Sequence, residues 1–244
     1  LDYLLALLPK LAGKGIVYFS SKKKADEIND KLVTKGFKSA VYHADLELTE
    51  RFLVQQQFLN DQLDVICATS AFGMGINKPN IRYVIHYHMP NDLEAYVQEI
   101  GRCSRDGRPG IAVLLYEPSD LKRQEFLIEK TLPNSQQIKY FIKHQELLQN
   151  FASEETQLLA RLLANGYRKD QIETLVKKRQ TERNDALQKM YQYLKTGSCK
   201  RQFIAQYFGD KIENVHSSDT CCGADQAPPL EKLGLLGESV VRAD

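Results

Sequence analysis

Short apolar runs alternate with longer segments of helical periodicity between residues 13 and 116. The runs are rich in Val, Ile and Tyr, and we expect them to form strands at 15–19, 39–43, 63–68, 81–87 and 110–116. The segments between them predict helices near 21–36, 47–60 and 92–102. Strands that are apolar on both faces and separated by helices are typical of a parallel sheet covered by helices on both sides. This part of the chain is therefore predicted to be α/β.

The strand pattern stops after Tyr116, and residues from about 118 to 208 have helical periodicity. A single core seldom grows much past roughly 250 residues, so a chain of 244 residues favours two unequal units. The tail from 223 onward contains Pro228, Pro229 and scattered Gly, which is typical of a linker. We predict domains at 1–130, 131–226 and 227–244.

Composition excludes some classes of protein. The net charge is only +2, so any basic footprint must be local. The chain contains no run of 18 or more apolar residues, and its opening LDYLLALLPK is too short for a membrane span and lacks a cleavage site. We expect no membrane partner and a cytoplasmic, intracellular location. Because the chain starts without Met inside a helical pattern, we also expect a fragment of a longer protein.

One local basic stretch is hidden by the overall charge. Residues 168–201 contain ten Lys and Arg against four Asp and Glu. Lys177, Lys178 and Arg179 are the candidates for nucleic-acid contact in this stretch. A solvated helix face is the alternative interpretation.

The segment TSAFGMGINKPN at 69–80 follows an expected buried strand. In a parallel sheet, ligands gather at the loops that follow the strands. Gly73 and Gly75 would let backbone N–H groups approach a phosphate or a sugar closely, and Asn77 follows them. A simple turn is the alternative for a Gly pair in a loop.

The segment QEIGRCSRDG places Arg102 and Arg105 three residues apart. On a helix, this spacing puts both guanidinium groups on one face. One interpretation is a solvated face with ion pairs to Glu99 and Asp106. The other is that both cations, with Gln98, reach the same edge as the glycine loop and bind a polyphosphate, whose transferring group needs positive charge at its oxygens.

Several segments together resemble one family. GIVYFSSKKKADEI, YHADL, RFLVQQQF, DVICATSAFGMGINKPNIRYVIHYHMP and YVQEIGRCSRDGRPGIAVLLY are similar to motifs IV, V and VI of the RecQ DNA helicases, in the order and spacing of that family. The long ATSAFGMGINKP match distinguishes RecQ proteins from DEAD-box RNA helicases. The resemblance is close over 13–116, and CKRQFIAQYFGD at 199–210 is more loosely similar to the helical zinc-binding region.

The resemblance implies a RecA-like parallel sheet, the second motor lobe of an ATP-dependent 3′–5′ DNA helicase of repair and recombination, followed by a smaller helical zinc-binding subdomain. It implies ATP with Mg²⁺ as cofactor, shared with an N-terminal RecA-like lobe, and single-stranded DNA and duplex junctions as partners. A phosphate-binding loop of the form GxxxxGK[ST] is absent from the sequence, so we expect this chain to be inactive alone.

The resemblance also assigns roles to residues. It implies that Arg105 is the arginine finger and that Arg102 and Gln98 assist at the γ-phosphate. Contacts to the nucleotide are expected from Gly73, Gly75 and Asn77. Contacts to nucleic acid are expected from Ser20, Ser21, His43 and Thr69, which follow strands. Helix capping is the alternative for the two serines, and a structural role is the alternative for His43.

Five cysteines, an odd number, do not indicate a secreted disulfide framework. Cys199, Cys221 and Cys222, with His216, are the candidate zinc ligands, and the resemblance implies one Cys on a helix followed by three more. Asp225 stands where a thiolate is expected, so a bound zinc and a packed, reduced thiol cluster both stay open. A different class of function is a DNA-binding module that uses the basic helices 168–201 without a catalytic role.

Two further departures from the family pattern lie near the motifs. RecQ proteins usually have Gly where Asp45 stands, and Ala-Gly where Cys103 and Ser104 stand. Neither change removes a catalytic group, but we expect both to affect phosphate geometry and coupling.

Overall fold

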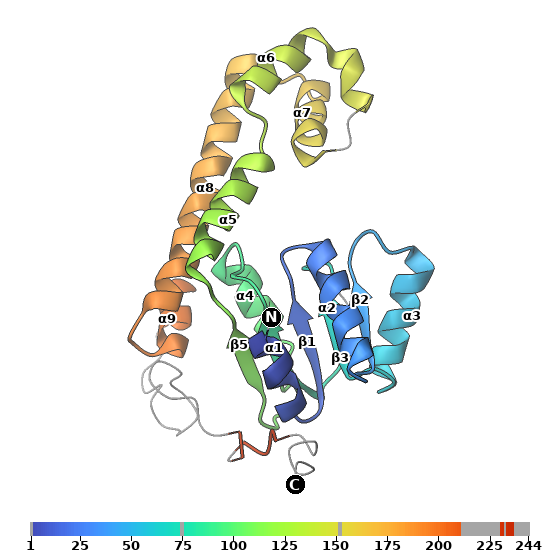
Figure 1. Ribbon diagram of the computed structural model, residues 1–244. Coiled ribbons are helices and arrows are strands. Elements are labelled where there is room, and N and C mark those ends of the chain that lie inside the picture. Colours follow the sequence, from blue (N-terminus) through green and yellow to red (C-terminus); the bar gives the residue numbers. More distant parts are fainter. Residues whose placement is uncertain (1, 74–75, 151–152, 211–229, 232, 237–244) are drawn as a thin grey trace. The chain divides into compact units, whose positions relative to one another are not determined.

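The computed structural model describes residues 2–73, 76–150, 153–210, 230–231 and 233–236 (Figure 1). The N-terminal helices are α1 (Asp2–Leu7) and the 3-10 helix η1 (Leu8–Lys10). The α/β part then contains β1 (Lys14–Tyr18), α2 (Lys22–Thr34), β2 (Ser39–Tyr42), α3 (Leu48–Leu59), β3 (Val65–Ala68), β4 (Ile81–His86), α4 (Leu93–Ile100) and β5 (Ile111–Leu114). The helical part contains α5 (Pro118–Lys130), α6 (Ser135–Lys143), the 3-10 helix η2 (Gln145–Asn150), α7 (Glu154–Ala164), α8 (Lys169–Lys195) and α9 (Lys200–Tyr207).

The five strands form one sheet in the order β2-β3-β1-β4-β5, and every pair of neighbours is parallel. One row of side chains shows the register, because paired residues follow one another across all five strands. This row is Val41, Cys67, Val17, Ile85 and Val113. The predicted parallel sheet is confirmed, with each strand within about two residues of its expected place.

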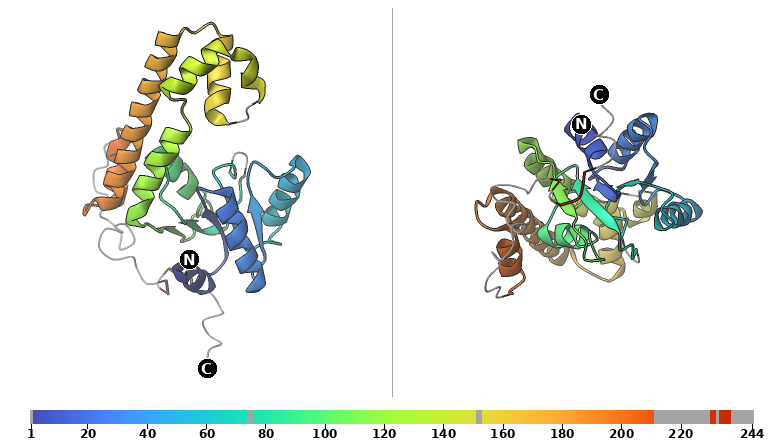
Figure 2. Two further views of the ribbon diagram at one scale, coloured as in Figure 1. Left: turned by 45° about the horizontal axis from the view of Figure 1, so that its top comes forward. Right: turned by 90° about the horizontal axis from the view of Figure 1, so that it is seen from below.

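Helices cover both faces of this sheet, as predicted. On one face, Leu4 of α1 and Ile28 of α2 pack into a cluster with Val17 and other strand residues. On the other face, Phe58 of α3 packs with a second set of strand residues, and Ile100 at the end of α4 lies against it. Figures 1 and 2 show the strands between these helices. The apolar character of the strands on both faces follows from this burial.

Helix α4 is shorter than predicted. Asp92 caps its start, where the carboxylate accepts a hydrogen bond from the Ala95 N–H at 2.6 Å. Its end is at Ile100, and Gly101 follows as the C-cap. The predicted helix near 92–102 is confirmed to within two residues at its end, and both motif arginines lie in the turn after the helix.

The chain divides into two compact units, 1–117 with 193–244 and 118–192. The second unit has its own core, which includes Leu132, Phe141, Leu159 and Ile172. Within it α5 and α8 run side by side, and Arg183 donates to the Thr131 hydroxyl at 2.6 Å (Figures 1 and 2). The predicted boundaries at 130 and 226 stay a prediction. None of the described helices has the length and apolarity that crossing a bilayer requires.

We expect Gly15→Ala to destabilise the first unit. Gly15 lies in β1, and a Cβ at this position would lie 1.9 Å from Cε2 of the buried Tyr83 ring. Overpacking of this kind costs about 1–3 kcal/mol of unfolding free energy, to be measured by urea denaturation. Gly197→Ala is the matched control, because a Cβ at Gly197 meets open space. Equal stability of the two variants would contradict the close packing of Tyr83 on β1.

Candidate functional site

Three candidate residues for nucleic-acid contact lie at one edge of the sheet. His43, Thr69 and Ser20 follow β2, β3 and β1, which are neighbours in the sheet. The Thr69 N–H donates to the Tyr42 carbonyl at 3.1 Å, which fixes the backbone where β3 ends. Because all strands are parallel, their carboxyl ends meet at this edge, as the sequence predicts.

The serines and the histidine at this edge differ in exposure. Ser20 and Ser21 are exposed, and Ser21 is the N-cap residue of α2, although its side chain makes no cap hydrogen bond. His43 is buried, and its Nε2 lies 3.1 Å from an Asp26 carboxylate oxygen. Its Nδ1 is also buried and has no partner among the described residues. His43 therefore has a structural contact, whereas the two serines are exposed residues.

The loop after β3 connects the two ends of the sheet. It begins at the carboxyl end of β3 and ends at the amino end of β4, where Ile81 begins the strand. Helix α4 returns in the opposite direction, so the turn after it also lies beside the start of β4. In this turn, the Ser104 N–H donates to the Ile81 carbonyl at 2.9 Å, and the Asp106 N–H donates to the Pro79 carbonyl at 3.3 Å. The arginines thus meet the glycine loop, as the sequence predicts.

Arg102 binds the first half of this loop. Its Nη1 donates to the Gly73 carbonyl at 2.6 Å. Gly73 has a φ of +144°, and a Cβ there would lie 2.1 Å from the Arg102 Cζ. Glycine is therefore required here both for its backbone conformation and for the close approach of the guanidinium group. Gly75, the second glycine of the motif, lies outside the described residues.

A buried group of side chains supports Arg102 from below. The Tyr18 hydroxyl donates to the Phe72 carbonyl at 3.0 Å, next to Gly73, the residue that Arg102 binds. Burial raises the pKa of Tyr18, so its hydroxyl keeps its proton. The Tyr18 ring stacks on His86 with ring centres 5.2 Å apart, and the His86 Nε2 lies 2.7 Å from a Glu99 carboxylate oxygen. These contacts join β1, β4 and α4 beneath the loop.

Arg105 binds the second half of the loop and is exposed. Its Nε donates to the Gly101 carbonyl at 3.2 Å, and its Nη1 donates to the Ile76 carbonyl at 3.3 Å and the Asn77 Oδ1 at 3.2 Å. Its Nη2 has no hydrogen-bond partner in the described part of the chain. Gln98 is exposed on the last turn of α4. The structure thus brings Arg102, Arg105, Gly73 and Asn77 to one loop.

The acidic residues of this segment have other partners. Glu99 is paired with His86, and Asp106 binds Arg82 through both carboxylate oxygens. The Arg82 guanidinium holds the pKa of the Asp106 carboxyl below its usual range. Among the described residues, no carboxylate pairs with Arg102 or Arg105. The interpretation of these arginines as members of ion pairs with Glu99 and Asp106 is therefore wrong.

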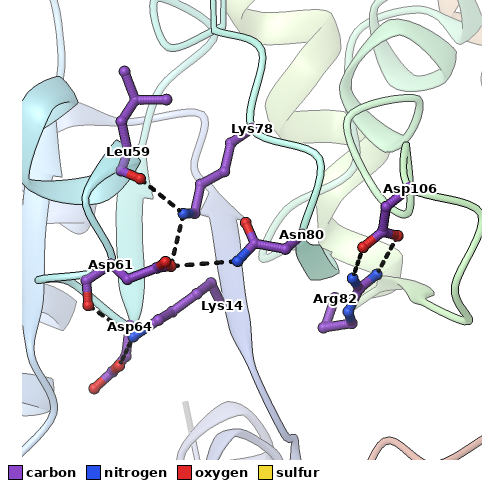
Figure 3. A network of polar contacts seen from close by, with 8 residues as sticks. All are labelled: Lys14, Leu59, Asp61, Asp64, Lys78, Asn80, Arg82 and Asp106. Carbon is purple, nitrogen blue, oxygen red and sulfur yellow. Dashed lines mark hydrogen bonds and ion pairs between the residues drawn. The ribbon is translucent and has the colours of Figure 1, made fainter.

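Figure 3 shows a polar network at the amino end of the strands. Lys78 is buried and donates to the Asp61 carboxylate at 2.7 Å and to the Leu59 carbonyl at 3.3 Å. The Lys78 ammonium lowers the pKa of Asp61. Lys14 binds Asp64 at 2.5 Å in the same view. Because Lys78 follows Asn77 directly, this network anchors the part of the loop that Arg105 contacts.

The remaining candidates lie on the helices. Lys177, Lys178 and Arg179 are exposed on α8. Cys199 is buried at the N-cap of α9. The other zinc candidates, His216, Cys221 and Cys222, lie outside the described residues. Within the described ranges, no group of three or more His, Cys, Asp or Glu residues is placed to hold a metal ion.

Sequence reasoning missed the residues that support the arginines. They are Tyr18, Asp61, Lys78, Arg82 and His86. Arg82 and His86 did carry a signal, because both are polar residues inside IRYVIH, a strand that is otherwise apolar on both faces. A polar side chain in a buried strand needs a partner, and the partners here come from segments distant in the sequence.

Two protein-family models match the chain. Residues 1–107 match the family model described as helicase conserved C-terminal domain, and residues 153–224 match the model described as RecQ zinc-binding. The two matches occur in one chain and in this order. The chain belongs to the RecQ family.

Two curated proteins and one solved structure illustrate what the chain is similar to. The RecQ-family chain is 36% identical over 240 residues to a probable ATP-dependent DNA helicase RecS of Bacillus subtilis, covering 91% of this chain and 48% of that protein. It is 42% identical over 224 residues to the ATP-dependent DNA helicase RecQ of Pasteurella multocida, covering 91% of this chain and 28% of that protein. The chain thus spans half the length or less of these relatives. Among solved structures, the S. cerevisiae Dbp5 C-terminal domain is 24% identical, with a TM-score of 0.44 over 52% of this chain and 75% of that one.

We expect Ser104→Gly to stabilise the RecQ-family chain by about 0.5–1 kcal/mol. Ser104 has a φ of +60°, the left-handed conformation that a side chain disfavours. Ser104→Ala is the control, because alanine keeps the Cβ and therefore the strain. Urea denaturation of the three proteins measures the difference. A glycine variant no more stable than the alanine variant would show that a Cβ at this backbone conformation costs little, which would contradict the expectation.

Proposed function

We propose that this chain supplies the second motor lobe and the zinc-binding region of a RecQ-type ATP-dependent DNA helicase that translocates 3′–5′. In this proposal a first RecA-like lobe binds ATP with Mg²⁺, and Arg105 reaches its γ-phosphate. The chain alone then has no hydrolytic activity. The family matches and the relatives named as helicases support the proposal, and the geometry of the two arginines makes it specific.

One observation carries the proposal. Two guanidinium groups meet one loop, and in the described chain they bind only neutral oxygen atoms. The nearby acids Glu99 and Asp106 are bound to His86 and Arg82. The positive charge at the loop is therefore not neutralised by the protein. An uncompensated pair of arginines favours an anion, and planar guanidinium groups suit phosphate oxygens.

The chemistry that this arrangement offers is charge stabilisation. Phosphoryl transfer spreads negative charge over the equatorial oxygens of the transferring group, and positioning and electrostatics supply most of the catalysis. Arg105 is exposed and has Nη2 available, so it is the candidate for direct contact. Arg102 is held by the Gly73 carbonyl, which suits a residue that shapes the loop. Gln98 is exposed one turn earlier and is proposed to assist.

The DNA partner is proposed for the opposite edge. Ser20, Ser21 and Thr69 offer hydroxyl groups and loop backbone at the carboxyl ends of β1 and β3. Short hydroxyls and backbone N–H groups commonly bind nucleic-acid phosphates. The loop after β3 begins at Thr69 and includes Asn77, which Arg105 binds. One loop therefore connects the proposed DNA contact with the proposed nucleotide contact.

Zinc is proposed for the region around Cys199. The RecQ zinc-binding match over 153–224 includes all four candidates, Cys199, His216, Cys221 and Cys222. Thiolates and imidazoles are the ligands that structural zinc sites use. Cys199 fits such a site because it is a buried thiol at the beginning of a helix. Bound zinc would cross-link this helix to the segment that follows it.

We expect Arg105→Ala in the full-length parent protein to lower DNA-stimulated ATP turnover by about a thousandfold or more, the scale of an arginine finger. DNA binding should persist, because Arg105 lies away from the proposed DNA edge. Arg108→Ala is the matched control, since Arg108 is an exposed arginine of the same segment. Steady-state ATPase assays and fluorescence anisotropy with labelled DNA measure the two effects.

The same assays discriminate against a simple DNA-binding module. In that alternative, replacing Lys177, Lys178 and Arg179 with alanine would abolish binding and lower the dependence of affinity on salt. Arg105→Ala would then leave turnover unchanged, an outcome that would falsify the motor assignment. The exposure of all three basic residues on α8 makes the alternative specific enough to test.

We expect about one zinc per chain in the purified protein. Cys199→Ala should lose the metal and lower the thermal midpoint, because a structural zinc contributes folding energy. Cys67→Ala is the matched control, since Cys67 is buried in β3. Metal content is measured by mass spectrometry after dialysis against a chelator. A metal-free wild-type protein, or equal zinc in both variants, would favour the reduced thiol cluster.

A further inference from the structure

We propose that Arg82 is a positioning residue for Arg105, because it binds the Asp106 carboxylate and so keeps the arginine unpaired. This inference rests on the proposed function and adds to it a residue that touches neither nucleotide nor DNA. Arg82 and Asp106 face one another in Figure 3. Their contact joins the beginning of β4 to the turn that holds both motif arginines.

The Arg82–Asp106 contact uses both oxygens of the carboxylate. Nη1 of Arg82 donates to Oδ1 at 3.1 Å, and Nη2 donates to Oδ2. Oδ1 also accepts a hydrogen bond from the Arg108 N–H at 3.1 Å. The side chains are 13% and 24% exposed, so the pair is partly shielded from water. Bidentate pairing in such a position is among the stronger ionic contacts in proteins.

The sheet fixes the position of Arg82 independently of its contact with Asp106. Arg82 is the second residue of β4, between buried neighbours of the strand. Its stem lies on Gly13, where a Cβ would be 2.5 Å from the Arg82 Cγ. The guanidinium group is therefore presented to the turn by the sheet. This pre-arrangement lowers the entropy lost when the pair forms.

Asp106 would otherwise compete with the nucleotide. It follows Arg105 directly in the chain, and Arg105 binds only neutral oxygens in the described residues. If Arg82 did not bind it, the Asp106 carboxylate would pair with Arg105 and neutralise the positive charge that is proposed to bind a phosphate. Arg82 prevents this by a stronger, bidentate contact. The role depends on where Asp106 points, so removing both charges should restore function.

The test uses Arg82→Met, Asp106→Asn and the double variant in the full-length parent protein. We expect Arg82→Met to lower the DNA-stimulated kcat by about tenfold or more, with the dissociation constant for DNA unchanged within about twofold. The double variant should recover most of the lost turnover, because it has no carboxylate to pair with Arg105. A purely structural role of Arg82 would give no recovery.

The control is Lys31→Met, which removes the partly exposed Lys31–Glu27 ion pair on α2 and should leave kcat unchanged. Thermal unfolding of each variant shows whether it is folded. If Arg82→Met does not fold, Arg82→Lys, which keeps a cation at this position, takes its place in the comparison. Wild-type turnover in Arg82→Met, or a double variant as slow as the single one, would overturn the inference. Unchanged turnover in Arg105→Ala would instead overturn the proposed function on which it rests.

Discussion

The structure of this site depends on which cations the acidic residues bind. Glu99 and Asp106 lie within the motif that carries Arg102 and Arg105, yet their carboxylates are bound to His86 and Arg82. The motif arginines consequently bind carbonyl and amide oxygens. Such neutral partners hold a guanidinium group in place without cancelling its charge. A bound anion would supply the missing countercharge, so ligand binding and the order of the loop should strengthen one another.

Chain direction explains how these residues meet. All five strands are parallel, so each connection must return to the amino end of the sheet before the next strand begins. The connection after β3 returns as a loop, and the connection after β4 returns as α4, on the same face of the sheet. Both therefore arrive beside Ile81 at the start of β4. Contacts from Arg102 and Arg105 to this loop result from two crossovers that end at neighbouring places.

The sequence predicted the strands, their parallel arrangement and the helices on both faces, because the periodicity of the apolar residues in each segment determines these features locally. It also predicted that the arginines and the glycine loop meet. It did not predict the turn that follows α4, where the apparent helical spacing of Arg102 and Arg105 continues past Gly101 and Ser104 has a positive φ. The sequence also did not predict the partners of Glu99 and Asp106. Arg82 can be recognised as the partner of Asp106 only when it is known that β4 begins beside the turn. Such pairings arise from tertiary structure and leave little trace in local pattern.

The turn after α4 combines strain with firm attachment. Ser104 occupies a left-handed conformation that costs roughly 1–2 kcal/mol for a residue with a side chain. Two backbone hydrogen bonds to Ile81 and Pro79 and the ion pair of Asp106 hold the turn in place nevertheless. Glycine, usual here in the family, would remove the strain without removing these attachments. The attachments, more than the identity of residue 104, therefore determine where Arg105 stands, and a change in the position of β4 would be transmitted directly to it.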